Sequence, residues 1–336
     1  MKMHAMDFRQ TVKAPIAGRF IRRYGADLAL ALTIGTYATT ANASLDDYAG
    51  SMGLPQELTV SASCGLVIDQ PFTTVQFEDD LYCESAPALT VEADDVTIDL
   101  NGKTLRVDDF QEHGWAILVR NSDRYTIRGN NDVREDNYPS TIDGNVGGGI
   151  GVSNSSHGSI YGITIKGAPV TGTGIGLYKN SYDNRIRFVD ITAKSVAGMV
   201  ISQNSEKNVL ADSKVEYSNV GVSVESKSHG NRIMNTNFYA VDYAIAAILV
   251  GAWPLPPEQA EPVYDTVVVN NRIRHDIAMW GIFFAQESTG EAGHNFVDGD
   301  TSRWHIEAEN ISLYLGMHNY AAYCYPDSIC KPSYGT

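Results

Sequence analysis

The chain has 336 residues, of which 43% are hydrophobic and 19% are charged, and its 25 Lys and Arg stand against 40 Asp and Glu for a net charge of −15. This composition excludes an intrinsically disordered chain and leaves room for one large domain or two ordinary ones. Because residues 1–43 carry six basic and two acidic residues, the rest of the chain has a net charge of −19. Phosphate backbones bind proteins mainly through Lys and Arg, so we expect no nucleic-acid partner.

Residues 1–43 have the pattern of a signal peptide. A positively charged segment ends at Arg22 and Arg23, a mildly apolar stretch follows, and Ala-Asn-Ala at 41–43 forms a small-x-small cleavage site before Ser44. The paired arginines leave a twin-arginine export signal open, and an amphipathic helix that stays attached is the alternative. No later stretch reaches the ~18 apolar residues of a membrane span. We therefore expect a secreted or periplasmic protein without a membrane span.

Four cysteines form two sequence-local pairs near the two ends of the mature chain. We predict the disulfides Cys64–Cys83 and Cys324–Cys330, although four cysteines permit three connectivities. Disulfides agree with export to an oxidising compartment. A zinc site is disfavoured because neither pair has the two-residue spacing of a zinc knuckle.

A short phrase of glycine and apolar residues recurs through the middle of the chain. Its first apolar positions are spaced 25, 24, 23 and 23 residues apart, and the phrase returns once more after an insertion. The copies are Gly149–Val152, Gly174–Leu177, Gly198–Ile201, Gly221–Val224, Ala244-Ile245 and Gly281–Phe284.

A period of this length, made of short β-rich runs with Asn, Ser and Gly at the corners, indicates a solenoid of stacked coils. One coil cannot bury its own apolar face, so the coils stack at about 4.8 Å and form parallel sheets around a continuous core. We predict two interior files, in which each residue lies above its counterpart in the next coil. They are Ile150, Ile175, Met199, Val222 and Ile245, and Ile165, Ile191, Val215, Phe238 and Ile273.

The letters of one segment resemble a known family. Val96–Leu105 reads VTIDLNGKTL and follows Cys64-Gly65 and Asp79–Cys83. This resembles the opening coil of exported bacterial right-handed parallel β-helix repeat proteins of the pectin-lyase-like superfamily. The resemblance covers roughly residues 64–310 and implies an all-β, single-stranded right-handed parallel β-helix with N- and C-terminal caps. It implies little about chemistry, because that superfamily includes lyases, hydrolases, epimerases and non-catalytic proteins.

The predicted chain has four parts, and two stretches interrupt the repeat. Residues 130–145 are rich in Asp and Asn, and residues 251–264 contain Trp-Pro-Leu-Pro-Pro. Both are predicted loops that leave the barrel, where function tends to lie. The four parts are a signal peptide (1–43), an N-terminal cap (44–90), the right-handed parallel β-helix (91–310) and a C-terminal cap (311–336).

Side chains between the interior positions of a strand must point to solvent. Beside the file that contains Phe238, two outward rows carry charged and aromatic groups. The first row is Thr164, Asp190, Lys214, Asn237 and Arg272, and the second is Lys166, Thr192, Glu216, Tyr239 and Arg274.

These rows predict a polysaccharide site. Lys214 or Arg274 is the candidate catalytic residue, as the Brønsted base of a β-elimination. Basic side chains would bind hydroxyls or a uronate carboxylate, and Tyr239 would stack on a sugar ring. The alternative is a solvated face whose charges pair between rungs, with Asp190 above Lys214. The candidate substrate-binding residues are Glu216, Tyr239, Arg272, Trp253 and Phe283.

Trp253 and Phe283 lie apart from the charged rows in the sequence. Phe283 points outward if its two neighbours fill the core, and Trp253 of the inserted loop would join it in a sugar-stacking platform. The alternative is that these aromatic residues cover the last coils beneath the cap.

We predict no metal site and no cofactor, with calcium as the open alternative. Calcium binds oxygen ligands, which the acidic run at 130–143 offers. The run has neither EF-hand spacing nor the nonapeptide of calcium-binding β-rolls. Its acidic residues are Asp132, Glu135, Asp136 and Asp143.

Two functions stay open at this stage. The first is an enzyme that acts on a polysaccharide, a lyase or a glycoside hydrolase. The second is a non-catalytic cell-surface or periplasmic module that binds a glycan or has a structural role. The sequence contains neither the Asp-Pro-His of mannuronan epimerases nor the combined Asn-Thr-Asp, Asp-Asp and Gly-His-Gly motifs of polygalacturonases.

Overall fold

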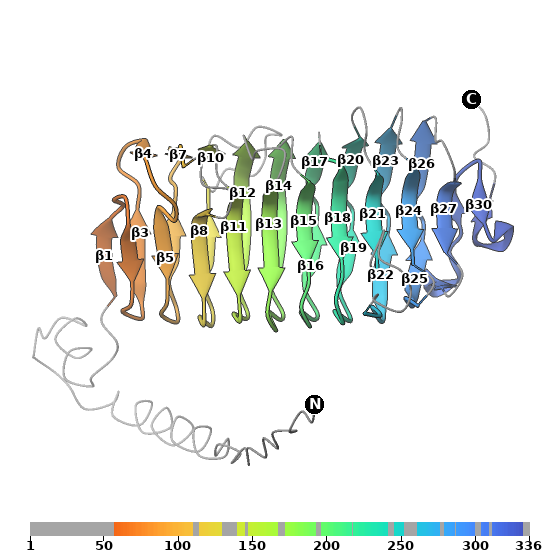
Figure 1. Ribbon diagram of the computed structural model, residues 1–336, viewed down its shortest axis with the longest axis horizontal. Coiled ribbons are helices and arrows are strands. Elements are labelled where there is room, and N and C mark those ends of the chain that lie inside the picture. Colours follow the sequence, from red (N-terminus) through yellow and green to blue (C-terminus); the bar gives the residue numbers. More distant parts are fainter. Residues whose placement is uncertain are drawn as a thin grey trace, which may run out of the picture. The chain divides into compact units, whose positions relative to one another are not determined.

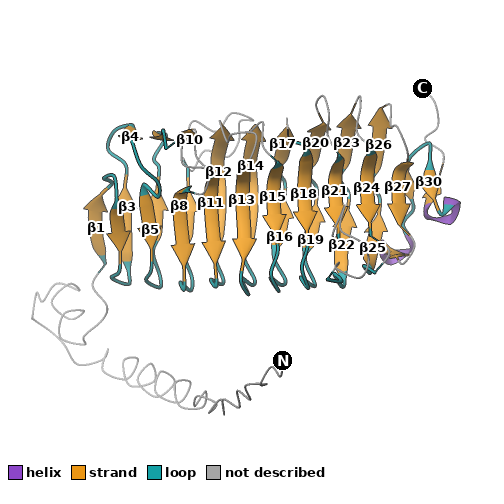
Figure 2. Cartoon of the chain, viewed as in Figure 1, coloured by secondary structure: helices purple, strands orange, loops and turns teal. Residues whose placement is uncertain are grey.

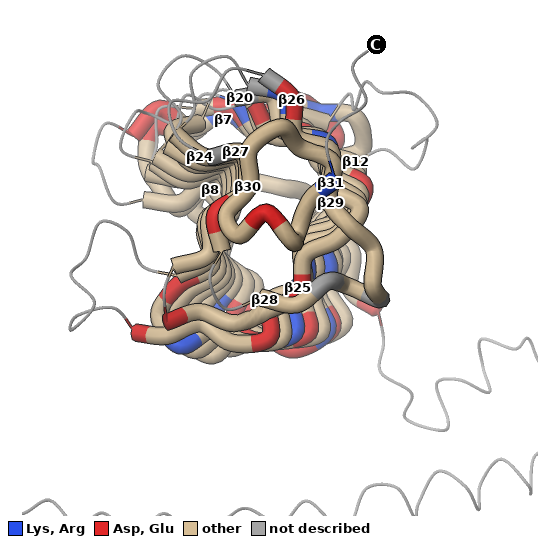
Figure 3. Tube along the Cα trace, turned by 90° about the vertical axis from the view of Figure 1, so that its right-hand side faces the viewer, with Lys and Arg blue, Asp and Glu red and all other residues tan. Residues whose placement is uncertain are grey.

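The computed structural model describes residues 57–331, apart from 110–113, 130–139, 145–146, 167–171, 193–195, 217, 241–244, 252–260, 276–278, 286, 300–303 and 309–310. The predicted signal peptide lies outside these residues. The described chain winds into a stack of coils with three faces, each built of parallel strands, and Figure 1 shows the stack from the side and Figure 3 along the stacking axis. Almost all regular structure is strand (Figure 2), with two 3-10 turns, η1 (Tyr314–Gly316) and η2 (Asp327–Ile329), near the C-terminus.

Face 1 is an 11-stranded parallel sheet with one strand per coil. Several of its middle strands contain the recurring glycine phrase. In order they are β2 (Leu66–Ile68), β5 (Leu89–Val91), β8 (Trp115–Arg120), β11 (Gly148–Ser153), β13 (Thr173–Tyr178), β15 (Ala197–Ile201), β18 (Val220–Val224), β21 (Ala246–Val250), β24 (Trp280–Phe284), β27 (Trp304–Ala308) and β30 (Cys324–Tyr325).

Faces 2 and 3 belong to one 20-stranded parallel sheet, joined where two long strands run along both. Those two strands are β12 (Ser159–Lys166) and β14 (Arg185–Thr192). Face 2 also has β1 (Leu58–Ser61), β3 (Thr73–Gln76), β6 (Thr97–Asp99), β9 (Thr126–Arg128), β16 (Val209–Ala211), β19 (Arg232–Met234), β22 (Thr266–Val269), β25 (Gly290–Gly293) and β28 (Ile311–Leu313). Face 3 also has β4 (Leu81–Cys83), β7 (Thr104–Val107), β10 (Thr141–Gly144), β17 (Lys214–Glu216), β20 (Asn237–Ala240), β23 (Arg272–His275), β26 (Phe296–Gly299), β29 (Asn319–Tyr320) and β31 (Cys330–Lys331).

The all-β parallel solenoid predicted from the repeat is therefore confirmed. The file of Ile165, Ile191, Val215, Phe238 and Ile273 pairs residue by residue along face 3, and each member is at most 2% exposed. Because this file fills the interior, the residues on either side of it point outward, as the candidate site requires.

The other predicted file is correct for four of its five members. Ile150, Ile175, Met199 and Val222 pair in succession along face 1. The fifth prediction was wrong, because Val222 pairs with Ile248 and not with Ile245. Ile248 is fully buried, whereas Ile245 is half-buried before the strand begins. The coil before it is three residues longer than the repeat predicts, so the Ala244-Ile245 copy of the phrase was misaligned.

The first glycine of each phrase has a packing reason. At these positions a Cβ would point into the interior and meet the face 3 file that packs opposite. A Cβ at Gly149 would lie 2.7 Å from Ile165 Cγ2, and one at Gly174 would lie 2.6 Å from Ile191 Cγ2. Real Cβ atoms are not found so close to other atoms, so glycine permits the two faces to approach.

Buried asparagines connect the rungs at two corners. Asn184, Asn208 and Asn231 are fully buried, and each side-chain amide donates to the next side-chain oxygen, at 2.9 and 3.2 Å. A second ladder at the corner between faces 2 and 3 consists of Asn271, Asn295 and Asn319, with distances of 3.0 and 2.8 Å. These ladders satisfy polar groups that burial would otherwise leave without partners.

The parallel pairing extends beyond the predicted β-helix at both ends. β1 pairs with β3 from Leu58 onward, so the segment predicted as an N-terminal cap contributes its own rungs. The last rung reaches Lys331. Disulfides close both ends with the predicted connectivity, Cys64–Cys83 and Cys324–Cys330. Among the described residues there is no helix of the length and apolar character that a membrane crossing requires.

Candidate functional site

The two outward rows of face 3 lie in the predicted register. In the first row, Asp190 pairs with Lys214, Lys214 with Asn237, and Asn237 with Arg272. In the second row, Glu216 pairs with Tyr239 and Tyr239 with Arg274. Three consecutive strands, β17, β20 and β23, therefore bring five of the seven candidate catalytic and substrate-binding residues onto one surface. These are Lys214, Glu216, Tyr239, Arg272 and Arg274.

Lys214 is the centre of this surface. Its ammonium donates to Glu216 Oε1 at 2.8 Å and lies 5.5 Å from the centroid of the Tyr239 ring. Partial burial works to lower the pKa of Lys214, but the hydrogen bond to Glu216 and the charges of Asp190 and Glu216 outweigh it, so the pKa is raised. At neutral pH the side chain is therefore a firmly protonated cation held against an aromatic face.

Asp190 lies beside Lys214 in the strand register, but the structure gives no ion pair between these two side chains. The alternative interpretation placed Asp190 above Lys214, and the two residues do lie in register, but among the described residues the ion pair of Lys214 is with Glu216 on its own strand. Within the described part of the chain, the buried Oδ1 of Asp190 has no hydrogen-bond partner. Burial raises the pKa of Asp190, and the charge of Lys214 offsets this only in part. A carboxyl with a raised pKa stays protonated to a higher pH than a solvated carboxyl does.

Arg272 and Arg274 extend the surface by one more rung. Both are exposed, and neither makes an ion pair with any residue that the structure describes. Arg272 also lines a depression of about 480 Å³ with Phe296 and Tyr320 at the corner between faces 2 and 3. Two free guanidinium groups on one strand can bind a carboxylate or vicinal hydroxyls in bidentate fashion.

Of the remaining two candidates, the structure describes only Phe283, and it lies on another face. Phe283 belongs to β24 on face 1, where its ring lies 4.7 Å from that of Trp280. It is half-buried against a small apolar cluster on the outside of face 1 that includes Leu249 and Trp280. Trp253 lies outside the described residues. Face 3 therefore does not share a platform with Phe283.

Sequence reasoning missed the aromatic residue that does extend the first row. Phe296 follows Arg272 in register on β26 and is 38% exposed. The signal was available, because Phe296 stands 24 residues after Arg272, which is one repeat.

A second aromatic site was missed on face 1, whose outward row the sequence presents as plain. Trp115 lies across glycines of the next two rungs, since a Cβ at Gly151 or Gly176 would lie 2.5 or 2.7 Å from its ring. The Tyr178 ring centroid is 5.9 Å from that of Trp115. Burial raises the pKa of Tyr178 to about 12, so its hydroxyl stays protonated at neutral pH.

In the described part of the chain, no group of three or more His, Cys, Asp or Glu side chains is arranged to hold a metal ion. Three of the four acidic residues considered for calcium, Asp132, Glu135 and Asp136, lie outside the described residues. Asp143 lies on β10, at the N-terminal end of the second row, in register with Lys166.

No protein-family model matches the chain, and no curated protein matches it. Solved structures do match its fold. The alginate lyase from Paenibacillus sp. str. FPU-7 is 14% identical with a TM-score of 0.50, over 76% of this chain and 98% of the lyase. DFA-IIIase from Arthrobacter chlorophenolicus A6, without its lid and in complex with GF2, is 11% identical with a TM-score of 0.50, over 83% of this chain and 89% of that one. The chain thus has the fold of a right-handed parallel β-helix.

Proposed function

We propose that this is an exported protein that binds a polysaccharide along face 3, with the chain of the glycan parallel to the stacking axis. The observation that carries the proposal is the register of Lys214, Tyr239, Arg272 and Arg274 on three consecutive strands. Rungs repeat at about 4.8 Å, which is close to the length of one sugar residue in an extended glycan. A repeating protein surface can therefore contact a repeating polymer once per rung.

The chemistry of the surface supports a glycan. Tyr239 and Phe296 offer aromatic faces to the C–H faces of a sugar ring, while the unpaired Arg272 and Arg274 offer donors to hydroxyls or carboxylates. Other proteins with this fold are named as an alginate lyase and a DFA-IIIase. The two disulfides support export, since disulfides persist in oxidising compartments.

Cleavage of the bound glycan is the second part of the proposal. Asp190 lies beside Lys214 on the neighbouring strand, Glu216 lies two residues along the strand of Lys214, and the raised pKa of Asp190 suits a general acid. The sequence favoured Lys214 or Arg274 as base in a β-elimination. Lys214 has a raised pKa and an arginine is permanently charged, so neither side chain is a good proton acceptor at neutral pH. Both side chains are better suited to bind an anion. The alternative function is a glycan-binding module without catalysis.

The test is a screen of purified protein against alginate, pectate and several neutral polysaccharides, with and without calcium. A rise in ultraviolet absorbance from unsaturated sugar ends indicates a lyase, and new reducing ends without that absorbance indicate a hydrolase. Binding without either product supports the non-catalytic module. No binding and no product with any glycan would overturn the proposal.

Variants then locate the activity. Tyr239→Ala/Arg272→Ala/Arg274→Ala should abolish binding or turnover, and Asp190→Asn should abolish turnover with binding retained. Arg185→Ala is the matched control, because Arg185 is an exposed arginine on face 2. Unchanged activity in the triple variant would place the site elsewhere.

A further inference from the structure

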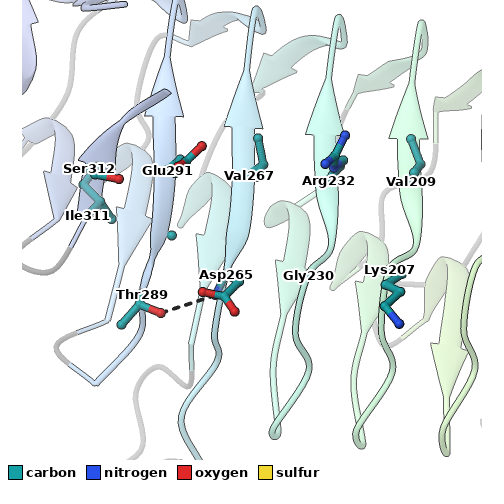
Figure 4. A pocket seen from close by; sticks show the side chains of 11 residues that line it. Lys207, Val209, Gly230, Arg232, Asp265, Val267, Thr289, Glu291, Ile311 and Ser312 are labelled. Carbon is teal, nitrogen blue, oxygen red and sulfur yellow. Dashed lines mark hydrogen bonds between the residues drawn. The ribbon is translucent and has the colours of Figure 1, made fainter. Parts of the chain in front are cut away.

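A long groove on face 2 takes no part in the surface described above. Its volume is about 1030 Å³, and 11 residues from strands β16, β19, β22, β25 and β28 and from the corner before them line it. Figure 4 shows Val209, Arg232, Val267 and Glu291 side by side on consecutive strands of this groove. The groove thus runs along the stacking axis, across the strands.

One outward row forms the floor. Val209, Arg232, Val267, Glu291 and Ser312 pair in succession, one per rung. Apolar and polar side chains alternate over the first four rungs, and Val209 and Val267 are half-buried. Five rungs at about 4.8 Å span roughly 19 Å, which is room for a short stretch of an extended polymer.

The polar groups of the groove are available to a ligand. Among the described residues, the Arg232 guanidinium and the Asp265 and Glu291 carboxylates have no hydrogen-bond or ion-pair partner. The Asp265 backbone amide, by contrast, donates to Thr289 Oγ1 at 3.3 Å (Figure 4). The groove therefore presents free donors and free acceptors next to an aliphatic floor.

The charges of the groove decide which ligand suits it. The two basic residues of the lining equal Asp265 and Glu291 in number, and the Lys207 ammonium lies 3.9 Å from Glu206 Oε1, so the groove has no excess positive charge. A polyanion would meet two unpaired carboxylates here, and the mature chain as a whole is acidic. A neutral sugar chain has hydroxyls that both donate and accept, and C–H faces that pack on valine side chains.

We propose that the face 2 groove is a second glycan-binding site, specific for a neutral polysaccharide, with Arg232 and Glu291 as its main polar contacts. The site is separate from the face 3 surface and does not depend on it. A protein with both sites holds one glycan on face 2 while face 3 engages the same polymer or another.

The test is affinity electrophoresis of the folded protein in native gels that contain hydroxyethylcellulose, dextran, galactomannan or alginate. We expect at least one neutral glycan to retard the protein. The double variant Arg232→Ala/Glu291→Ala should be retarded less, with an apparent Kd for that glycan at least tenfold higher. Both residues lie outside the core, so the urea midpoint of the double variant should stay unchanged.

Arg185→Ala is the matched control, because Arg185 occupies the same row one rung before Val209 and does not line the groove. Arg185→Ala should bind the neutral glycan within twofold of the unchanged protein. The inference is overturned if no neutral glycan retards the protein. It is also overturned if the face 2 double variant keeps the apparent Kd of the unchanged protein for that glycan.

Discussion

Gly221 of β18 and Phe238 of β20 lie against each other across the interior, and a Cβ at Gly221 would lie 2.7 Å from Phe238 Cδ1. The same relationship holds one rung earlier, where a Cβ at Gly198 would lie 2.4 Å from Val215 Cγ1. Face 1 therefore presents backbone, and face 3 presents a large side chain, at the same height of each coil. The period of the glycine phrase is the period of this contact.

Phe238→Ala should lower the free energy of unfolding by about 3–5 kcal/mol, because it leaves a cavity opposite a glycine that cannot fill it. Gly221→Ala should cost about 1–3 kcal/mol by the opposite effect, overpacking. Urea unfolding followed by circular dichroism measures both. Asn237→Ala, an exposed neighbour on the same strand, should change stability by less than about 0.5 kcal/mol. Equal effects at positions 237 and 238 would contradict the interior file.

Asn208 is the middle residue of its ladder and should be the most costly to remove. Its Oδ1 accepts from the Asn184 backbone N–H at 3.0 Å, and its amide donates to Ser181 O at 3.0 Å. Asn208→Ala leaves these buried groups without partners, at about 1–3 kcal/mol for each. Asn204→Ala is the control, because its amide donates to Asn180 from an exposed corner. A loss in Asn208→Ala no larger than in the control would show that the ladder does not stabilise the stack.

Removing the two disulfides should have unequal effects. Cys64 and Cys83 are 19 residues apart, and Cys324 and Cys330 are six apart. Loop-closure entropy predicts a loss of about 3 kcal/mol for Cys64→Ser/Cys83→Ser and a smaller loss for Cys324→Ser/Cys330→Ser. Urea unfolding of the two double variants measures this, and the reverse order would show that strain or local contacts outweigh loop closure.

The fold was predictable because the repeat itself encodes it. A 23- to 25-residue period places apolar residues on successive rungs, and the pairing of Ile191 with Val215 and of Val215 with Phe238 follows it directly. The prediction failed at Ile245, because the coil after Val222 is three residues longer than the period and Ile248 takes the interior position. Local loop length is set by the turn and not by the period, so the misalignment arose there.

The site was predictable in part, for the same reason. Parity along a strand decides which side chains point outward, so the row from Lys214 to Arg272 could be read from the sequence. The sequence could not predict which outward charges form ion pairs. Lys214 has two acidic neighbours, Asp190 beside it and Glu216 two residues along its own strand, and it pairs with Glu216. The face 2 groove could not be predicted from the sequence either, since it is formed by side chains of five rungs that are far apart in the chain.

Asp190 and Asp123 should respond to pH in opposite directions. Burial raises the pKa of Asp190. Burial also works to raise the pKa of Asp123, but hydrogen bonds with His157 and Ser156 and the charge of Arg124 outweigh it, so that pKa is lowered. A raised folded-state pKa means that ionised Asp190 destabilises the fold, whereas a lowered one means that ionised Asp123 stabilises it.

Asp190→Asn should therefore stabilise the protein at about pH 6. This gain in stability should shrink as the pH falls through the raised folded-state pKa of Asp190. It should be gone below the ordinary aspartate pKa of 3.8. Asp123→Asn should destabilise the protein at about pH 6, and this loss should fade as the pH falls through the ordinary pKa toward the lowered one. Urea unfolding of both variants from about pH 6 down to about pH 3.5 measures the two slopes. If Asp190→Asn destabilises the protein at the upper pH, the ionised carboxylate has a stabilising partner. The proposal of a protonated acid on face 3 would then lose its physical basis.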